Sequence, residues 1–290
     1  MFGRFASRTA EAVCLMRAYE HAHPAGKCVV DDPYAQWFLR PLARAALVLG
    51  SAPPNIERYA DWATDGLRRF VIARHRYIDD ALVRALRKRV EQVVVLGAGY
   101  DTRAYRFARQ LRGRPVFEVD HPATSERKRR IVEQHLDELP HPNVTRVEVD
   151  FETQSFRDEL GKAGFHTRRQ TFFIWEGVAM YLTRTAVKST LSTLAKMSAP
   201  GSAVVMDLWY LPDEPDILST ARRFSSNLLA LLGEPVTFGL HPEDAGPFVA
   251  RLGFRVCEIA DATVLRQRYF KPSVYIYPTN YLLHAVVVRR

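Results

Sequence analysis

Residues 93–120 constrain the fold more than any other part of this chain. An apolar run is followed by the turn Gly97-Ala98-Gly99, a helical pattern, and a second apolar run that ends in Asp120. This order predicts a buried strand, a helix and a second buried strand. Glycines in the turn let a ligand approach the backbone closely, and an acid at the end of the second strand accepts hydrogen bonds from ribose hydroxyls. The layout indicates a site for the adenosine half of a cofactor.

From residue 91 onward, short apolar segments alternate with helical patterns, which predicts a mostly parallel sheet with helices on both faces. We therefore expect an α/β, Rossmann-like fold with a seven-stranded sheet. The expected strands are residues 92–96, 115–119, 144–149, 171–175, 203–208, 255–259 and 281–288. The helical patterns that stand out between them are residues 102–111, 124–136 and 185–197.

Two further regions are expected to be helical. Residues 1–90 have apolar positions at helical spacing, punctuated by prolines, and predict an N-terminal helical cap region before a catalytic domain of residues 91–290. Residues 210–242 interrupt the strand–helix alternation with a helical pattern between proline and glycine breakers. An insertion after the carboxyl end of a strand lies over the ligand crevice of an open sheet. We expect a substrate-covering helical cap there, and a structural helix on the rim of the sheet is the alternative.

The composition is that of a soluble globular protein, with 290 residues, 47% hydrophobic and 25% charged. No apolar run is long enough to span a bilayer and no signal peptide is evident, so we expect a cytoplasmic protein without a membrane partner. The net charge of +9 would suit an anionic partner. However, the basic runs fit exposed helix faces, and no aromatic–basic motif indicates nucleic-acid binding. Three widely separated cysteines predict neither disulfides nor a metal site.

The glycine turn also indicates the type of cofactor. In dinucleotide-binding proteins a third glycine usually stands three positions after the second, where the helix meets the pyrophosphate. Here that position holds Thr102, followed by Arg103. A cofactor without a pyrophosphate therefore fits better, and S-adenosylmethionine is the obvious candidate. Its sulfonium and amino-acid ends need carboxylate, carbonyl and arginine partners. A dehydrogenase is the competing interpretation.

Acids stand where several predicted strands end. Asp120 has the spacing of a ribose-binding acid, and Glu118 must point to the opposite face of its strand. Asp150 and Phe151 could accept the adenine amino group and cover its ring, although Asp150 could equally cap a helix. Glu176 follows a buried strand, where a carboxylate needs a partner or solvent. A cationic ligand would be a suitable partner for it.

Several motifs together resemble the leucine carboxyl methyltransferase family, a branch of the S-adenosylmethionine-dependent methyltransferases that includes many bacterial O-methyltransferases. The matching segments are residues 17–20, 31–35, 73–80, 95–103, 118–122 with Lys128, and 175–182. The resemblance covers most of residues 15–210 and is more specific than the glycine turn alone. It leaves the acceptor substrate open, because the C-terminal third departs more from the family pattern.

The resemblance implies roles for residues around the methionine part of the cofactor. Arg74 would pair with its carboxylate, and Glu176 would contact its amino group. The turn formed by Gly97, Ala98 and Gly99 would pass beneath it. These five positions form the expected binding site for the amino-acid end of the cofactor.

The resemblance likewise implies roles at the adenosine and at the transferred methyl group. Asp120 would hold the ribose hydroxyls, and Asp150 and Phe151 would address the adenine. Tyr181 would lie near the methyl-transfer site and is the one catalytic candidate. No spacing of His, Cys and acidic residues predicts a metal.

We expect O-methylation of a carboxylate or hydroxyl of a small, apolar, polyketide-like metabolite. A carboxylate is already ionised at neutral pH, whereas a phenol or alcohol would benefit from a general base. His75, His121 and His241 are candidates by residue type, and we assign none. The alternatives are a protein C-terminal carboxyl methyltransferase and a non-catalytic S-adenosylmethionine-binding protein. Residues 176–179 lack the Pro-Pro-aromatic loop of enzymes that methylate nucleic-acid bases. The oligomeric state is open.

Overall fold

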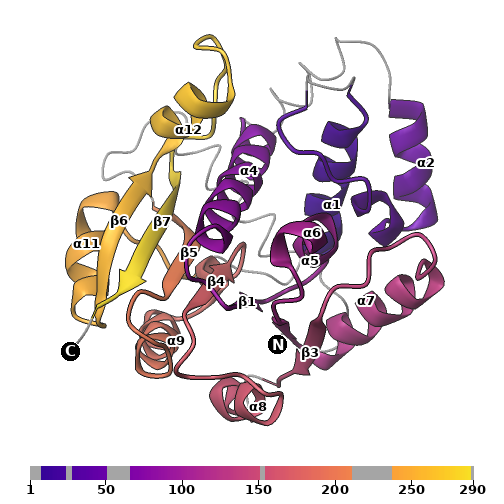
Figure 1. The fold of residues 1–290 in the computed structure, drawn as a ribbon. Helices are drawn as coiled ribbons and strands as arrows, with labels where there is room; N and C mark the ends of the chain where they lie inside the picture. Colours follow the sequence, from indigo (N-terminus) through magenta and orange to yellow (C-terminus); the bar gives the residue numbers. More distant parts are fainter. Residues whose placement is uncertain (1–7, 24–27, 51–65, 151–153, 211–236, 289–290) are drawn as a thin grey trace.

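A seven-stranded sheet forms the centre of the protein in a computed structural model, which describes residues 8–23, 28–50, 66–150, 154–210 and 237–288 (Figure 1). Its strands are β1 (Gln92–Leu96), β2 (Val116–Asp120), β3 (Val144–Glu148), β4 (Thr171–Trp175), β5 (Ala203–Trp209), β6 (Phe254–Ala260) and β7 (Asn280–Val287). The order is β3-β2-β1-β4-β5-β7-β6. Strands β1 to β5 are parallel, and β7 runs antiparallel to both β5 and β6. The predicted Rossmann-like, mostly parallel sheet is confirmed.

The central strands are apolar because helices cover both of their faces. Every residue of β1 and β4 is buried, as expected for inner strands of a parallel sheet. In the register of the sheet, Val94 of β1 is paired with Phe117 of β2 and Phe173 of β4. The edge strands β3 and β6 contain exposed positions. Continuous apolar runs therefore mark the inner strands, and mixed polarity marks the edges.

Helices lie on both faces of the sheet. Their bounds are α1 (Arg8–His21), η1 (Ala35–Phe38), α2 (Pro41–Gly50), α4 (Leu67–Leu86), α5 (Arg103–Arg106), α6 (Ala108–Leu111), α7 (Pro122–Gln134), α8 (Phe156–Lys162), η2 (Ala179–Tyr181), α9 (Arg184–Lys196), α11 (Pro242–Ala250) and α12 (Ala262–Tyr269). The single helix predicted over residues 102–111 is two short helices, with Phe107 between them at φ −107° and ψ 21°.

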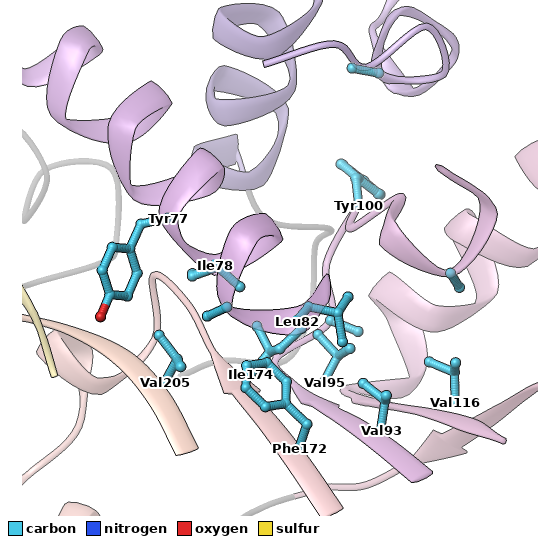
Figure 2. Packing of buried hydrophobic residues seen from close by; sticks show 14 of the residues in the cluster. Tyr77, Ile78, Leu82, Val93, Val95, Tyr100, Val116, Phe172, Ile174 and Val205 are labelled. Carbon is cyan, nitrogen blue, oxygen red and sulfur yellow. The ribbon is translucent and has the colours of Figure 1, made fainter. Parts of the chain in front are cut away.

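Two apolar cores lie on opposite faces of the sheet. On one face, Ile78 and Leu82 of α4 pack in the same cluster as Val95 and Ile174 (Figure 2), and α1 and η1 contribute to it. The other core contains buried residues of α8, α9 and α11. A fully buried aliphatic or aromatic side chain contributes about 1.5–3 kcal/mol relative to an exposed one. The apolar residues of α4 that are buried in the first core therefore hold this helix against one face of the sheet.

The two regions expected to form caps are described in part. Helices α1, α2 and α4 account for much of residues 1–90, and α1 contacts both α2 and α4. Residues 211–236, most of the expected insertion, lie outside the described residues. The described residues that follow it contact η2 and β5, where the Thr237 amide donates to the Met180 carbonyl (2.8 Å) and the Leu240 amide donates to the Trp209 carbonyl (2.9 Å). Within the described ranges, no helix has the length and apolar character needed to cross a membrane.

Candidate functional site

The predicted site residues converge on one edge of the sheet, where the parallel strands β1, β2, β4 and β5 end. Strand β1 leads into the glycine turn, β2 ends at Asp120, β4 is followed by Glu176, and β5 carries Asp207 near its end. Helix α4 brings Arg74 to the same edge, although Arg74 and Glu176 are 102 positions apart in the sequence. In open α/β sheets, ligands bind outside the carboxyl ends of the strands. This edge is therefore the candidate site.

The glycine turn requires glycine for a conformational and a steric reason. Gly97 and Gly99 have φ values of +65° and +46°, in a region that side chains disfavour. A Cβ atom on Gly97 would overlap the Cγ2 atom of Val178. The amides of Gly97 and Ala98 both donate to the Val119 carbonyl, at 2.8 and 3.1 Å. The turn is thus fixed to the end of β2 and presents bare backbone to the edge of the sheet.

Asp120 lies beside this turn, whereas Glu118 points elsewhere. The Asp120 carboxylate accepts hydrogen bonds from the amides of Gly99 and His121, and the residue is partly exposed. Burial raises the pKa of Asp120, although the two amides act in the opposite direction. Glu118 is buried and pairs with Lys128 at 2.8 Å. Of these two acids, Asp120 is the one in a position to meet a ligand at the glycine turn.

Arg74 is buried and bound at two of its three guanidinium nitrogens. Its Nε donates to Glu176 Oε1 (2.9 Å) and its Nη1 donates to Asp207 Oδ2 (2.7 Å). No described residue accepts a hydrogen bond from Nη2. Burial alone would lower the pKa of Arg74, but the charges of Asp207 and Glu176 outweigh it and raise that pKa. Arg74 is therefore a permanent cation, and its Nη2 has no acceptor among the described residues.

Glu176 is ionised and faces several nitrogen donors. Its Oε1 accepts from Arg74 and lies 3.3 Å from the His75 Nδ1 atom, and its Oε2 lies 2.8 Å from Arg103 Nη1. Burial alone would raise the pKa of Glu176, but the charges of Arg103 and Arg74, together with a hydrogen bond from His75, hold it well below its usual value. The side chain is 11% exposed. Glu176 is thus a carboxylate at the mouth of a buried polar cluster.

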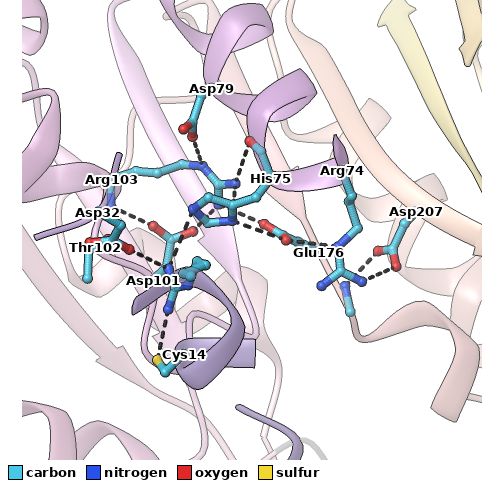
Figure 3. Close-up of polar contacts among 12 residues, drawn as sticks. Cys14, Asp32, Arg74, His75, Asp79, Asp101, Thr102, Arg103, Glu176 and Asp207 are labelled. Atoms are coloured by element: carbon cyan, nitrogen blue, oxygen red, sulfur yellow. Dashed lines mark hydrogen bonds and ion pairs between the residues drawn. The ribbon is translucent and has the colours of Figure 1, made fainter. Parts of the chain in front are cut away.

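This cluster of charged side chains extends from Asp207 to α1 (Figure 3). Arg103 is central, because it donates to Asp79 (2.7 Å), pairs with Asp101 and Glu176, and contacts His75. Among the described residues, the cluster contains four arginines and five acids: Arg17, Arg74, Arg103 and Arg106, with Asp32, Asp79, Asp101, Glu176 and Asp207. These groups carry one excess negative charge, since burial and Arg103 lower the pKa of His75 and favour its neutral form. A positively charged ligand would balance it.

Helix α1 covers the glycine turn. The Cβ of Ala10 lies 3.6 Å from the position a Cβ on Gly99 would occupy. Arg17 donates to the Tyr100 carbonyl (2.8 Å) and pairs with Asp32 (3.1 Å). Asp32 also accepts a hydrogen bond from Thr102 Oγ1 at 2.7 Å. The N-terminal helix is therefore tied by buried polar contacts to the segment that follows the turn.

Of the remaining predicted residues, Asp150 and Tyr181 lie at or near the same edge. Asp150 follows β3, and its backbone exchanges hydrogen bonds with Gln154. Helix α8 has Ser155 at its N-cap, so the alternative role of Asp150 as a helix cap is wrong for this helix. Phe151 lies outside the described residues. Tyr181 is partly exposed at the end of η2, in the loop that begins at Glu176.

The structure also bears on the three histidines considered as bases. His75 is buried in the charged cluster, and the His121 side chain caps α7 by accepting a hydrogen bond from the Ala123 amide (3.2 Å). His241 packs against Tyr210, with ring centroids 4.9 Å apart. Over the part of the chain that the structure describes, no group of three or more His, Cys, Asp or Glu residues could hold a metal ion. None of these contacts assigns a base.

Sequence reasoning missed the residues that support Arg74 and Glu176. Asp207 interrupts the otherwise apolar strand β5, and a buried acid in such a strand needs partners. That signal was available in the sequence. The roles of Arg103 and Asp79 carry no comparable signal, because arginines and acids are frequent in exposed helices and their burial depends on the tertiary fold.

The strand order, the antiparallel seventh strand and the acidic edge define a Rossmann-like α/β protein of the methyltransferase type. The family model described as leucine carboxyl methyltransferase matches residues 10–195. The chain belongs to this family, and the resemblance stated from its motifs is confirmed.

Relatives agree with this assignment, and a solved structure has the same fold. A protein of Mycobacteroides abscessus, assigned provisionally by its name to the S-adenosyl-L-methionine-dependent methyltransferases, is 34% identical over 202 residues, 68% of this chain and 64% of that protein. The match thus spans slightly under two thirds of that relative. A Mycobacterium bovis protein of the same designation is 30% identical over 91% of this chain and 85% of its own length. The crystal structure of a DUF574 family protein from Streptomyces avermitilis has the same fold, with a TM-score of 0.59, 13% identity, and coverage of 94% and 96%.

Proposed function

We propose that this protein is an S-adenosylmethionine-dependent O-methyltransferase that acts on a carboxylate or hydroxyl of a small, apolar, polyketide-like metabolite. The observation that carries the proposal is the pairing of Arg74 with Glu176 at the edge of the sheet, where Arg74 Nη2 has no acceptor among the described residues and the Glu176 carboxylate is partly exposed, so that the pair could bind the two charges of a zwitterion. The names of the relatives agree with the cofactor.

The residues present fit the charges of S-adenosylmethionine. Arg74 would bind the carboxylate of the methionine part through Nη2, and Glu176 would accept a hydrogen bond from its ammonium group. Asp120 would accept hydrogen bonds from the ribose hydroxyls, beside the turn that contains Gly97 and Gly99. The excess negative charge of the buried cluster would favour the positively charged sulfonium. A nicotinamide dinucleotide, whose phosphates are anionic, fits this charge pattern poorly.

When bound, the cofactor supplies a methyl group on a positively charged sulfur atom. The chain would then contribute mainly positioning and the exclusion of water. Helix α1 covers the glycine turn, and Tyr181 stands in the loop after β4, where it would lie near the methyl group. A carboxylate acceptor needs no base at neutral pH. With a hydroxyl acceptor, a base would have to come from a residue that we do not assign.

Calorimetry followed by methyl transfer tests the proposal. We expect S-adenosylhomocysteine to bind and NAD to leave the calorimetric signal unchanged. A panel of apolar carboxylic acids and phenols would then be incubated with methyl-labelled cofactor. Mild alkali releases methanol from esters and leaves ethers intact, which separates the two acceptor types. Label that enters a protein band in a cell extract, with none in the small molecules, would favour the protein carboxyl methyltransferase instead.

A further inference from the structure

Asp207 is a buried acid that contacts two parts of the site at once. It is 1% exposed in β5. Its Oδ2 accepts a hydrogen bond from Arg74 Nη1 (2.7 Å), and its Oδ1 accepts one from the Gly177 amide (2.6 Å). The carboxylate therefore connects helix α4 to the turn that follows β4.

This double contact determines how Arg74 faces the edge of the sheet. A guanidinium group is planar and rigid, so holding two of its nitrogens fixes the direction of the third. Asp207 and Glu176 hold Nη1 and Nε, and no described residue accepts a hydrogen bond from Nη2. Gly177 has φ +68°, and a Cβ there would lie 3.6 Å from Nη2. That distance is an ordinary van der Waals contact, and Nη1 would be 3.7 Å away, so the Gly177 turn passes directly beside the guanidinium group.

Stability alone is a weak reason for an acid at this position. Replacing a buried ion pair by apolar residues of similar volume is often neutral or stabilising. Geometry is a stronger reason, because a cationic side chain with one fixed free nitrogen recognises a carboxylate with less loss of freedom on binding.

We propose that Asp207 is a positioning residue for the amino-acid end of the cofactor. It aligns Arg74 and the Gly177 turn and makes no contact of its own with the ligand. This inference rests on the proposed role of Arg74, and it adds to the site a residue that the family motifs did not indicate.

The substitution Asp207→Asn tests this role with two ligands. An amide cannot accept both hydrogen bonds, because its NH2 group must face either Arg74 or the Gly177 amide. S-adenosylhomocysteine has the amino-acid end, and 5′-methylthioadenosine lacks it. We expect D207N to lower the affinity for S-adenosylhomocysteine roughly 10- to 100-fold, as measured by calorimetry. The affinity for 5′-methylthioadenosine should change less than about twofold. Equal losses for both ligands, or no loss for either, would overturn the proposal.

The same substitution in a protein that already lacks Arg74 distinguishes the positioning role of Asp207 from a folding defect in D207N. In Arg74→Met, Asp207 no longer has its cationic partner, so D207N should change S-adenosylhomocysteine affinity less than about twofold relative to R74M alone. If D207N lowered the affinity for S-adenosylhomocysteine in the R74M protein as much as it does in the wild type, the inference would be contradicted. Glu258→Gln is the matched control, because Glu258 lies in the edge strand β6 and pairs with Arg268, and both ligands should bind it as they bind the wild type. If the wild type binds neither ligand, the proposed function fails, and this inference fails with it.

Discussion

At the scale of single residues, the site depends on side chains that are oriented by several hydrogen-bond partners and can still form a further hydrogen bond to a ligand. Asp120 illustrates this, because each of its oxygens already accepts one amide hydrogen bond and has a further lone pair. The amides orient the carboxylate, and the remaining lone pairs are available to vicinal hydroxyls.

We expect Asp120→Ala to weaken S-adenosylhomocysteine binding by about 1–3 kcal/mol, the cost of leaving polar partners unsatisfied. Calorimetry measures the loss, and the same titration with 5′-methylthioadenosine should show it too, because that ligand retains the ribose. Unchanged affinity for both ligands would refute the ribose role.

Gly97→Ala should be more destabilising than Gly113→Ala. Both glycines have positive φ, +65° and +75°, but a Cβ on Gly113 meets no atom within 4 Å, whereas on Gly97 it meets Val178. We expect a loss of about 1–2 kcal/mol at Gly113 from backbone strain alone, and a larger one at Gly97. Urea unfolding of both variants measures the difference. Equal losses of unfolding free energy in the two variants would show that Val178 can move away from the new Cβ without destabilising the protein.

Sequence reasoning identified those residues whose chemistry shows in local order. The glycine turn and Asp120 have a recognisable spacing, and Glu176 directly follows an apolar run. Arg103 and Asp79 could not be found in this way, because their burial depends on the packing of α4 against the segment after β1. The sequence shows that both residues are charged, but it does not show that they lie close together in the fold.

At the scale of elements, polar contacts tie helix α1 to the segment that follows β1. Arg17 and Asp32 form a buried pair, with side chains 3% and 0% exposed. Breaking such a pair from one side leaves an uncompensated buried charge. The position of α1 over the turn is therefore sensitive to one arginine.

We expect Arg17→Met to lower the free energy of unfolding by about 3–5 kcal/mol. Arg76→Met is the control, because Arg76 pairs with Asp80 at the surface, where an ion pair contributes about 1 kcal/mol or less. Urea denaturation compares the two variants. Adding Asp32→Asn to R17M should recover part of the loss, and a loss no greater than that of R76M would contradict the assignment.

The elements themselves were largely predictable from periodicity. All seven strands match the predicted segments to within one or two residues. The inner strands were recognisable because they are buried on two faces and are therefore almost entirely apolar. Helix α12 is outside the helices that the pattern singles out, and it begins where Asp261 accepts a hydrogen bond from the Val264 amide. The start of this helix is determined by the Asp261 cap. Its apolar face is too short to produce a recognisable helical periodicity in the sequence.

At the scale of the whole molecule, buried ionisable groups make stability depend on pH. Burial lowers the pKa of His284 to about 4, and the charge of Arg84 adds to this effect. Its usual value is about 6.5. Between these values the unfolded chain binds the proton and the folded chain does not, so stability falls as pH falls.

We expect His284→Gln to remove roughly 2 kcal/mol of the stability loss between pH 7 and pH 4.5. Urea unfolding of the wild type and H284Q at pH 8, 6 and 4.5 measures this, and the difference between them should be constant above pH 7. Parallel pH profiles over the whole range would contradict it. Below about pH 4, protonation of Asp32 and Glu176 should destabilise both proteins, since partners in the fold lower both pKa values.

The position of β7 has a consequence for biosynthesis. This strand comes last in the sheet along the chain, yet it lies between β5 and β6. While a ribosome is still making residues 280–287, β5 has no neighbour on that side and β6 has no place to dock. The nascent chain can form the parallel half early, but it must keep an unpaired strand edge protected until these residues emerge. Proteins truncated before residue 280 should therefore require chaperones or aggregate.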